Sequence, residues 1–78
     1  MSAAVTVYSK PRCVQCEATK RALTKAGINY DEVDLTTNPD LIAWITDELG
    51  YAQAPVVVVD DDNHWCGFRP DKIAGIPR

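Results

Sequence analysis

The chain alternates between segments with strand-like hydrophobicity and segments in which apolar residues return every three or four positions. Residues 4–9 and 29–35 are rich in β-forming residues and predict two strands, the second mixed enough in polarity to lie at a sheet edge. Residues 54–59 (APVVVV) are apolar on both faces and predict a central strand. After a polar turn at residues 60–63, residues 64–66 predict a short return strand.

The segments between these strands have the spacing of amphipathic helices. From about residue 13 to residue 26, four positions recur on one stripe that should face the core: Cys16, Thr19, Leu23 and Ala26. Gly27 is placed to end this helix in a left-handed conformation.

A second helix is predicted to begin at Asn38-Pro39-Asp40, which supply an N-cap, an N1 proline and an acidic first turn, and to end at Gly50. Its predicted buried face consists of Leu41, Ile42, Ile45 and Leu49. Pro70 and Asp71 indicate the start of a third, short helix.

The resulting order is strand, helix, strand, helix, strand, strand, helix. A helix-length connection between the first two strands implies a parallel β-α-β unit, and the last two strands form a hairpin. The smallest arrangement that satisfies this order is an α/β fold with a four-stranded mixed sheet flanked by three helices. The sequence contains no repeat, linker or low-complexity tract, so we expect residues 1–78 to form a single domain.

Composition and charge narrow the class of protein. The 78 residues are 46% hydrophobic and 8% aromatic, which is ordinary for a small globular domain. The formal net charge of −3, with both signs interspersed, gives no reason to expect nucleic acid or an anionic membrane as a partner. The first residues lack the pattern of a signal peptide, and the longest apolar run is far too short to cross a membrane. We therefore expect a cytoplasmic protein.

Cys13 and Cys16 form a Cys-x-x-Cys pair where the first strand ends and the first helix begins. The unpaired N–H groups and partial positive charge of a helix N-terminus favour a thiolate over a thiol. The i, i+3 spacing puts both sulfurs on one face of the first turn, close enough to form a disulfide. In a reducing compartment, such a pair indicates a reversible dithiol that transfers two electrons.

The two cysteines are predicted to have different roles. We expect Cys13, at the exposed start of the helix, to be the nucleophile, and Cys16, on the buried stripe, to be the resolving thiol. Lys10 and Arg12 bring positive charge close to Cys13, whereas Glu17 would oppose thiolate formation if its side chain turned toward the sulfur. Cys13 would attack a disulfide of the target, and Cys16 would then attack Cys13 to release the reduced target.

Two other interpretations of the pair are half of a zinc site and simple burial of two small side chains. His64 and Cys66 share one face of a predicted strand and would complete a Cys₃His set. Structural zinc sites usually take their second pair from a knuckle or helix at wider spacing, so we expect no metal and no other cofactor. His64 then reads as a polar hairpin residue, and Cys66 as either a half-buried side chain or a third, oxidisable thiol.

Two further features follow the second helix. Pro55 begins the predicted central strand, where proline is tolerated only at the first position. The Ala54-Pro55 step is either a plain strand start or a backbone that docks an extended peptide of the target beside the dithiol. Trp65, Phe68 and Arg69 form a bulky cluster after the hairpin, in which Trp65 is either core or part of a contact surface.

Residues 8–16 (YSKPRCVQC), Ala54-Pro55 and residues 65–71 (WCGFRPD) together resemble the NrdH-redoxin family of glutaredoxin-like proteins over nearly the whole chain. The resemblance implies a thioredoxin fold and a cis peptide bond before Pro55. It also implies reduction by thioredoxin reductase with NADPH rather than by glutathione. The implied client is the large subunit of class Ib ribonucleotide reductase, whose disulfide must be reduced after each turnover. At the position of Cys66, between the tryptophan and the glycine, the family usually has a small polar residue.

On this basis we expect a monomeric thiol-disulfide oxidoreductase with Cys13 and Cys16 as its catalytic residues. The expected partner-binding residues are Lys10, Arg12, Val14, Gln15, Ala54, Pro55, Trp65, Phe68 and Arg69. The main alternative is a glutathione-dependent glutaredoxin. The glutaredoxins that the chain resembles hold glutathione with a glycine-rich turn and acidic residues, in a segment where this chain has a tryptophan and an arginine.

Overall fold

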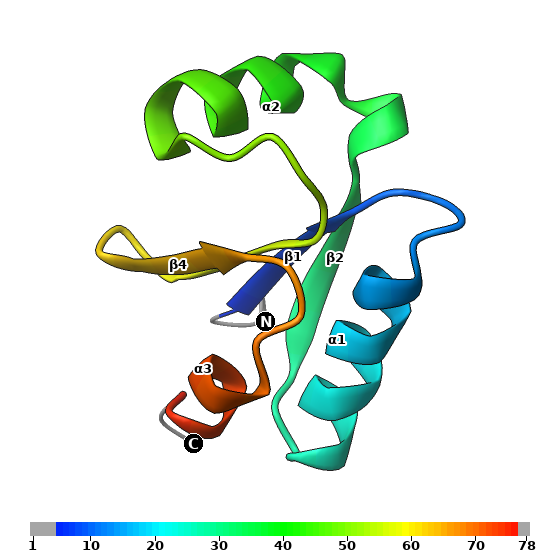
Figure 1. Ribbon diagram of the computed structural model, residues 1–78, viewed down its shortest axis with the longest axis vertical. Coiled ribbons are helices and arrows are strands. Elements are labelled where there is room, and N and C mark those ends of the chain that lie inside the picture. The colour runs from blue at the N-terminus through cyan, green and yellow to red at the C-terminus, as the bar shows by residue number, and fades with distance from the viewer. Residues whose placement is uncertain (1–4, 77–78) are drawn as a thin grey trace.

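Figure 1 shows a computed structural model of the chain, which describes residues 5–76. In chain order its elements are β1 (Val5–Ser9), α1 (Val14–Lys25), β2 (Tyr30–Asp34), a 3₁₀ turn η1 (Leu35–Thr37), α2 (Pro39–Trp44), a π-helical turn η2 (Ile45–Leu49), β3 (Val56–Asp60), β4 (Asn63–Cys66) and α3 (Pro70–Ala74). This order confirms the predicted α/β arrangement. Ala4, where we expected the first strand to start, lies outside the described residues.

The four strands form one mixed sheet in the order β2-β1-β3-β4. β1 pairs in parallel with β2 and antiparallel with β3, and β3 forms the expected hairpin with β4. β3 is therefore central and β2 lies at an edge, as their polarity predicted. α1 and α3 lie on one face of the sheet and α2 on the other (Figure 1). None of the helices within residues 5–76 is long and apolar enough to cross a membrane.

The main hydrophobic core lies between the sheet and the face covered by α1 and α3. It consists of Val5, Val7, Leu23, Ile28, Val57, Trp65, Ile73 and Ile76. Full burial of such a side chain contributes about 1.5–3 kcal/mol. Because this core packs β1 against α1, it also fixes the position of the turn between them, which carries Cys13.

Both ends of α1 are set by local sequence. Cys13 is the N-cap, with an extended backbone (φ −112°). At the C-terminal end, Gly27 has a φ of 76°. The N–H groups of Gly27 and Ile28 donate to the carbonyls of Thr24 (3.0 Å) and Leu23 (2.9 Å), which is the Schellman pattern. The predicted stripe of α1 is buried at Cys16, Thr19 and Leu23 and half-buried at Ala26.

The second helix departs from the prediction in its shape. It begins at Pro39 as expected, but the regular α-helix ends at Trp44 and continues as the π-helical turn η2 before Gly50, whose φ is 78°. Asn38 does not cap the helix with its side chain. Its amide instead donates to the Asp34 carbonyl (2.9 Å), which holds the preceding turn.

The predicted buried face of this helix was also partly wrong. Ile45 is 3% exposed, but Ile42 is 47% exposed, and Leu41 and Leu49 are half-buried. The physical reason is a contact that periodicity does not show: the ring of Trp44 packs 5.7 Å from the ring of Tyr8 on β1. Ile42 lies two positions before Trp44, about 200° around the helix, so when Trp44 contacts the sheet the Ile42 side chain faces solvent.

Candidate active site

Cys13 and Cys16 form a disulfide at the start of α1. Their Cα atoms are 5.1 Å apart, within the usual range for such a bond. Cys13 is 8% exposed and Cys16 is 1% exposed. Cys13 is therefore less open than we expected, but it is still the more exposed of the two residues. The structure represents the oxidised form of the pair.

Backbone groups surround the Sγ atom of Cys13. The N–H of Cys16 donates a hydrogen bond to it over 3.1 Å, an N-cap interaction that an oxygen makes in most helices. The carbonyl oxygen of Ala54 lies 3.9 Å from the same sulfur. After reduction, the N–H and the helix N-terminus are placed to stabilise a thiolate on Cys13.

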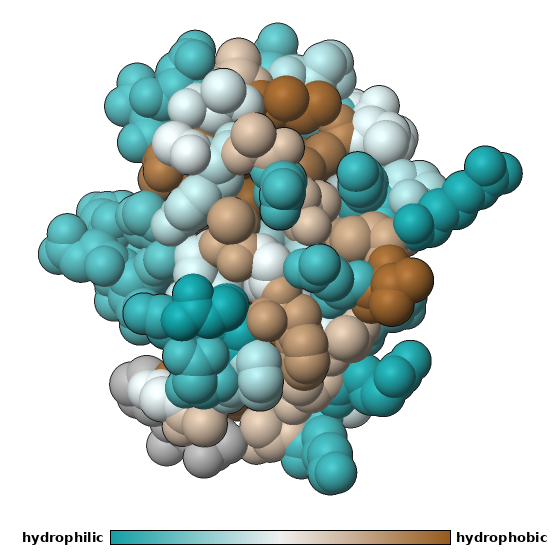
Figure 2. Space-filling view, viewed as in Figure 1, coloured by the Kyte–Doolittle hydropathy of each residue, from teal (hydrophilic) through white to brown (hydrophobic). Residues whose placement is uncertain are grey.

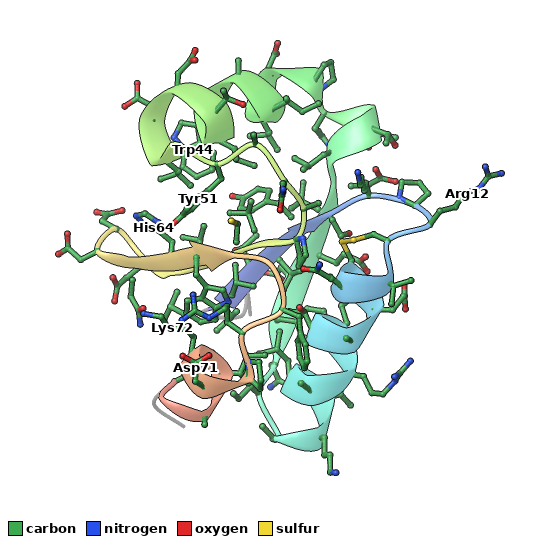
Figure 3. All side chains as sticks on the ribbon, viewed as in Figure 1. Arg12, Trp44, Tyr51, His64, Asp71 and Lys72 are labelled. Carbon is green, nitrogen blue, oxygen red and sulfur yellow. A yellow bond between two sulfur atoms is a disulfide. The ribbon has the colours of Figure 1, made fainter. Side chains whose placement is uncertain are left out.

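Charged side chains contribute less to this environment than the sequence indicated. Arg12 has a left-handed backbone (φ 59°), and its side chain extends away from the disulfide into solvent (Figure 3). The carboxylate of Glu17 pairs with the Nζ atom of Lys20 over 2.9 Å, so its charge is offset along the helix. Lys10 is exposed in the loop before the helix. In this oxidised form the Arg12 side chain is thus directed away from the sulfur, and the polar groups next to Cys13 Sγ are the Cys16 N–H and the Ala54 carbonyl.

Two backbone N–H groups hold the segment after β4 in place, one against the loop before β3 and one against the first turn of α1. Gly67 donates to the Pro55 carbonyl (2.8 Å), and Phe68 donates to the Oε1 atom of Gln15 (3.2 Å). Gly67 has a φ of 82°, and a Cβ added there would lie 3.3 Å from Gln15 Oε1. The backbone conformation and this close approach both favour glycine. The Ala54–Pro55 peptide bond is cis, as the resemblance implied.

Two of the predicted partner-binding residues present apolar surface next to the disulfide. Val14 is 85% exposed and Phe68 is 38% exposed. Figure 2 shows strongly hydrophobic surface at the start of α1, where Val14 lies. Trp65 differs, because its side chain is 3% exposed and belongs to the core. The interpretation of Trp65 as part of a contact surface is therefore corrected: β4 turns its indole inward, under α1 and α3.

Arg69 forms a bidentate ion pair with Asp71. Its Nε atom donates to Oδ1 (3.2 Å) and its Nη2 atom to Oδ2 (3.1 Å). The guanidinium holds the pKa of the Asp71 carboxyl below its ordinary value. The first carboxylate after β4 is therefore already paired with a cation from its own segment.

The residues of the possible zinc set have other contacts. The hydroxyl of Tyr51 donates to the His64 carbonyl (3.1 Å) and lies 2.8 Å from the Nδ1 atom of the His64 ring, toward which it points in Figure 3. Cys13 and Cys16 are bonded to each other, and Cys66 is a free, half-buried cysteine. Across residues 5–76, no group of three or more His, Cys, Asp or Glu residues is placed to hold a metal ion.

Sequence reasoning missed a polar network that connects α1 to the sheet. The hydroxyl of Ser9 (2.7 Å) and the Nζ atom of Lys20 (2.8 Å) both donate to the Oε2 atom of Glu32 on β2. These two donors hold the pKa of Glu32 below its ordinary value, and the carboxylates of Glu32 and Glu17 raise the pKa of Lys20. The i, i+3 spacing of Glu17 and Lys20 is a local signal. The contact with Glu32 has no such signal, because it depends on how α1 packs against the sheet.

Comparison with known proteins gives matches over most of the chain. The sequence profile of the Glutaredoxin family matches residues 5–65. The glutaredoxin-like protein NrdH of Salmonella typhimurium is 41% identical over 69 residues, which cover 88% of this chain and 83% of that protein. The gene 56 protein of Mycobacterium phage L5 is 42% identical over 71 residues, 91% of this chain and 69% of that protein. The solved structure of NrdH-redoxin from Escherichia coli is similar with a TM-score of 0.85 and 36% identity over 95% of each chain.

Proposed function

Because this chain belongs to the glutaredoxin family, as an NrdH-type redoxin, we propose that Cys13 and Cys16 carry electrons from thioredoxin reductase to the disulfide of class Ib ribonucleotide reductase. The chain is a thiol-disulfide oxidoreductase of this family. The observation that carries the proposal is the disulfide at the N-terminus of α1, with an N–H directed at Cys13 Sγ. The proposal concerns the reductant, the client and the role of each sulfur.

In the proposed reaction, the Cys13 thiolate attacks one sulfur of the client disulfide. That bond breaks, its electron pair leaves on the second client sulfur, and this sulfur takes up a proton. Cys16 then loses its proton and attacks Cys13 Sγ, so the first client sulfur leaves with the electron pair and is protonated in turn. The client gains two electrons and two protons, and the Cys13–Cys16 disulfide seen in the structure is the product.

The Arg69–Asp71 ion pair supports thioredoxin reductase as the source of electrons. The glutathione-dependent glutaredoxins that the chain resembles use acidic residues after the last strand to hold the ammonium group of glutathione. Here Asp71 is bound by Arg69 through both of its oxygens, and replacing one partner of such a pair with a ligand requires breaking two charge-assisted bonds. The E. coli protein, described as having a thioredoxin-like activity profile, is consistent with this choice.

The exposed apolar side chains beside the disulfide support a protein client. Val14 and Phe68 lie on the rim of the redox turn, by which we mean the segment that connects β1 to the first turn of α1 and carries Cys13. Apolar anchors of this kind dominate protein contacts. Next to them, the Ala54 carbonyl is close enough to Cys13 to align an extended client segment. We take the client to be the large subunit of class Ib ribonucleotide reductase, as the family resemblance implies, and place the reaction in the cytoplasm, where NADPH keeps dithiols reduced.

The test compares two sources of electrons for the oxidised chain. One reaction contains thioredoxin reductase and NADPH, and the other contains glutathione, glutathione reductase and NADPH. Each is coupled to a class Ib ribonucleotide reductase, with deoxyribonucleotide formation as the readout. We expect turnover with thioredoxin reductase and little with glutathione. Turnover with glutathione alone would identify a glutathione-dependent glutaredoxin instead.

A matched pair of variants tests the role of the ion pair in this choice. Arg69→Ala frees the Asp71 carboxylate and should raise the glutathione-dependent rate. Lys72→Ala removes an exposed cation of the same segment that does not pair with Asp71 in the structure, and it should leave that rate unchanged. Equal rates for both variants and the unmodified chain would show that the Arg69–Asp71 pair does not determine the reductant.

A further inference from the structure

Positive charge gathers on the part of the chain that carries the disulfide. Counted by segment, the two signs are less evenly mixed than the whole composition indicated. Residues 1–25 contain five of the eight Lys and Arg residues and one of the eleven Asp and Glu residues. Residues 26–68 contain nine acidic residues and no Lys or Arg. The segment with Cys13 and α1 is therefore cationic, although the whole chain has a formal net charge of −3.

The fold keeps much of the negative charge away from α1. Residues 60–62, all aspartates, end β3 and begin the turn to β4, at a hairpin tip on the opposite side of the molecule from α1 (Figure 1). Three further carboxylates, Asp40, Asp47 and Glu48, lie on α2 and η2. These elements cover the other face of the sheet (Figure 1). The charge separation along the sequence is thus also a separation in space.

The carboxylates closest to α1 lie between this helix and β2. Glu17 and Glu32 share the Nζ atom of Lys20, over 2.9 Å and 2.8 Å. Lys20 follows Val14 by six positions and therefore lies about 120° away from it around the helix. This network is displaced from the face of α1 that begins at Val14.

That face carries exposed cations next to the disulfide. The outer face of α1, by which we mean Val14, Ala18, Arg21 and Lys25, follows helical spacing and forms one continuous stripe. Val14 is 85% exposed, and both cations are exposed. They lie about 10 Å and about 16 Å from Val14 along the helix. Neither forms an ion pair with any residue from 5 to 76.

Arg12 adds a cation at the disulfide end of this stripe. It comes directly before Cys13, and its side chain extends into solvent, away from the sulfur (Figure 3). Within the described part of the chain it also has no ion pair. Its charge is therefore available to a partner that approaches the disulfide.

We propose that Arg12 and the outer face of α1 dock an acidic segment of the client protein, next to the client disulfide that is reduced. Val14 supplies an apolar contact, and the cations attract the carboxylates on either side of it. The inference rests on the proposed function, because it describes the partner of the same dithiol. The net charge of the whole chain would favour a basic partner instead, so the local surface and the net charge predict opposite preferences.

The attraction should act mainly on the association rate, and it should depend on salt. Charge complementarity raises association rates by about tenfold or more at low ionic strength. The screening length falls from about 30 Å in 0.01 M salt to about 3 Å in 1 M salt. Cations spread along α1 therefore act together only in dilute salt. We expect the preference for an acidic substrate to fall from about tenfold to less than about twofold across this range.

The experiment uses two synthetic peptides that contain the same Cys-x-x-Cys disulfide. One peptide has aspartates on both sides of the disulfide, and the other has lysines. The full chain is reduced, freed of reductant and mixed with each peptide, and the second-order rate constant is measured by acid quenching, alkylation and mass spectrometry. Each rate is divided by the rate of the same peptide with reduced dithiothreitol, which corrects for the effect of the flanking charges on the peptide disulfide. The acidic peptide should react about tenfold faster in 0.01 M salt.

A matched pair of variants tests whether the outer face of α1 causes this preference. Arg21→Gln and Lys72→Gln each remove one exposed cation, so they change the net charge equally. Lys72 lies on α3, on the side of the molecule away from Arg12 (Figure 3). Arg21→Gln should lower the preference by about twofold, because three cations share an effect of about tenfold. Lys72→Gln should leave it unchanged.

The salt dependence of the unmodified chain is a second measurement that needs no variant. Equal rates for the two peptides, a faster rate for the basic peptide, or a preference that does not change with salt would overturn the docking surface. An equal effect of Arg21→Gln and Lys72→Gln would overturn it as well. All of these outcomes leave the exchange reaction intact. If the reduced chain reacts with neither peptide, the exchange reaction of the proposed function fails, and the docking surface fails with it.

Discussion

At Cys13, one side chain combines a structural and a chemical role. Its sulfur takes the place of the oxygen that usually caps a helix and accepts the N–H of Cys16 over 3.1 Å. After reduction, the same N–H is placed to stabilise negative charge on the sulfur. Cys16 lies one turn deeper and is 1% exposed. Its sulfur can therefore attack a mixed disulfide at Cys13, but not the disulfide of a free client. The difference in position between two identical side chains therefore supports an attacking role for one and a resolving role for the other.

The first prediction concerns these two roles. Cys13→Ser should abolish disulfide reductase activity, because no other described sulfur is placed to attack a client. Cys16→Ser should still attack, and should stop after one turnover as a mixed disulfide between Cys13 and the client. Mass spectrometry under non-reducing conditions detects this adduct. Sustained turnover by Cys16→Ser would contradict the resolving role.

Cys66 provides the matched control for these variants. It is a free, half-buried cysteine at the end of β4. Cys66→Ser removes a thiol without touching the disulfide and should retain most of the activity. A large loss would show that the third thiol takes part in the exchange.

At the scale of elements, the start of α1 is held by side-chain hydrogen bonds to β2 and to the segment after β4. Glu32 on β2 accepts from Lys20 of α1 and from Ser9 at the end of β1. On the other side of the turn, Gln15 accepts from the backbone of the segment after β4. These contacts fix the first two turns of α1, and with them the geometry of the disulfide.

The second prediction is a pH dependence that comes from Glu32. Its pKa is lowered in the folded protein, first by Lys20 and then by Ser9. A lowered folded-state pKa contributes stability that is complete above the unfolded-state pKa and is lost as the pH falls through the folded-state pKa. Because the Glu32 side chain is 43% exposed, Glu32→Gln should reduce the free energy of unfolding at neutral pH by only about 0.5 kcal/mol.

This difference between Glu32→Gln and the unmodified chain should disappear in acid. It begins to shrink near the ordinary value of 4.5 and vanishes below the lowered pKa of the folded state. Urea unfolding at a series of pH values measures it. Asp47→Asn, at an exposed carboxylate of η2, serves as the control for the loss of a surface carboxylate. A constant difference at every pH would mean that Glu32 acts through packing rather than charge.

The third prediction compares two glycines with similar backbones. Gly27 and Gly67 have φ values of 76° and 82°, so alanine at either position should cost about 1–2 kcal/mol. A Cβ at Gly27 meets open space, whereas one at Gly67 would lie 3.3 Å from Gln15 Oε1. Both variants should lose stability in chemical denaturation, but only Gly67→Ala should also lower client reduction. Equal activity of the two variants would show that the contact with Gln15 does not matter for catalysis.

For the whole molecule, the two faces of the sheet are covered in different ways. α1 and α3 enclose the main core on one face, and α2 covers the other (Figure 1). On that second face the ring of Trp44 packs against the ring of Tyr8. The redox turn lies at the end of β1, beside the loop that enters β3. The Cα radius of gyration, 11.6 Å, matches the value of about 11.5 Å expected for a compact chain of this length.

The fourth prediction is that the chain is a monomer in solution. Its exposed large apolar side chains, Val14, Ile42, Trp44 and Phe68, are each 37–85% exposed, and single exposed residues of this kind do not require a second copy. Sedimentation and small-angle scattering should give the mass of one chain and a radius of gyration slightly above the Cα value. A dimer that dissociates on reduction would instead assign a cross-linking role to Cys66.

Much of the site was visible in local patterns, and what was missed depended on distant contacts. The position of Cys13 at a helix start, the left-handed Gly27 and the central β3 each follow from neighbours in sequence. The burial of Trp65 and the solvent exposure of Ile42 do not follow from sequence neighbours, because they depend on how each element packs against the sheet. Arg12 was expected to help Cys13 because the two are adjacent, but its left-handed backbone directs the side chain away.

The sequence by itself determined the order of elements, the caps of α1 and the chemistry of the Cys-x-x-Cys pair, because periodicity, capping and spacing act within a few residues. Only the tertiary structure decided that Glu32 and Gln15 hold α1 from two sides and that Asp71 is bound by Arg69. The reason is that these contacts depend on sheet register, backbone direction and helix packing, which arise from the fold as a whole.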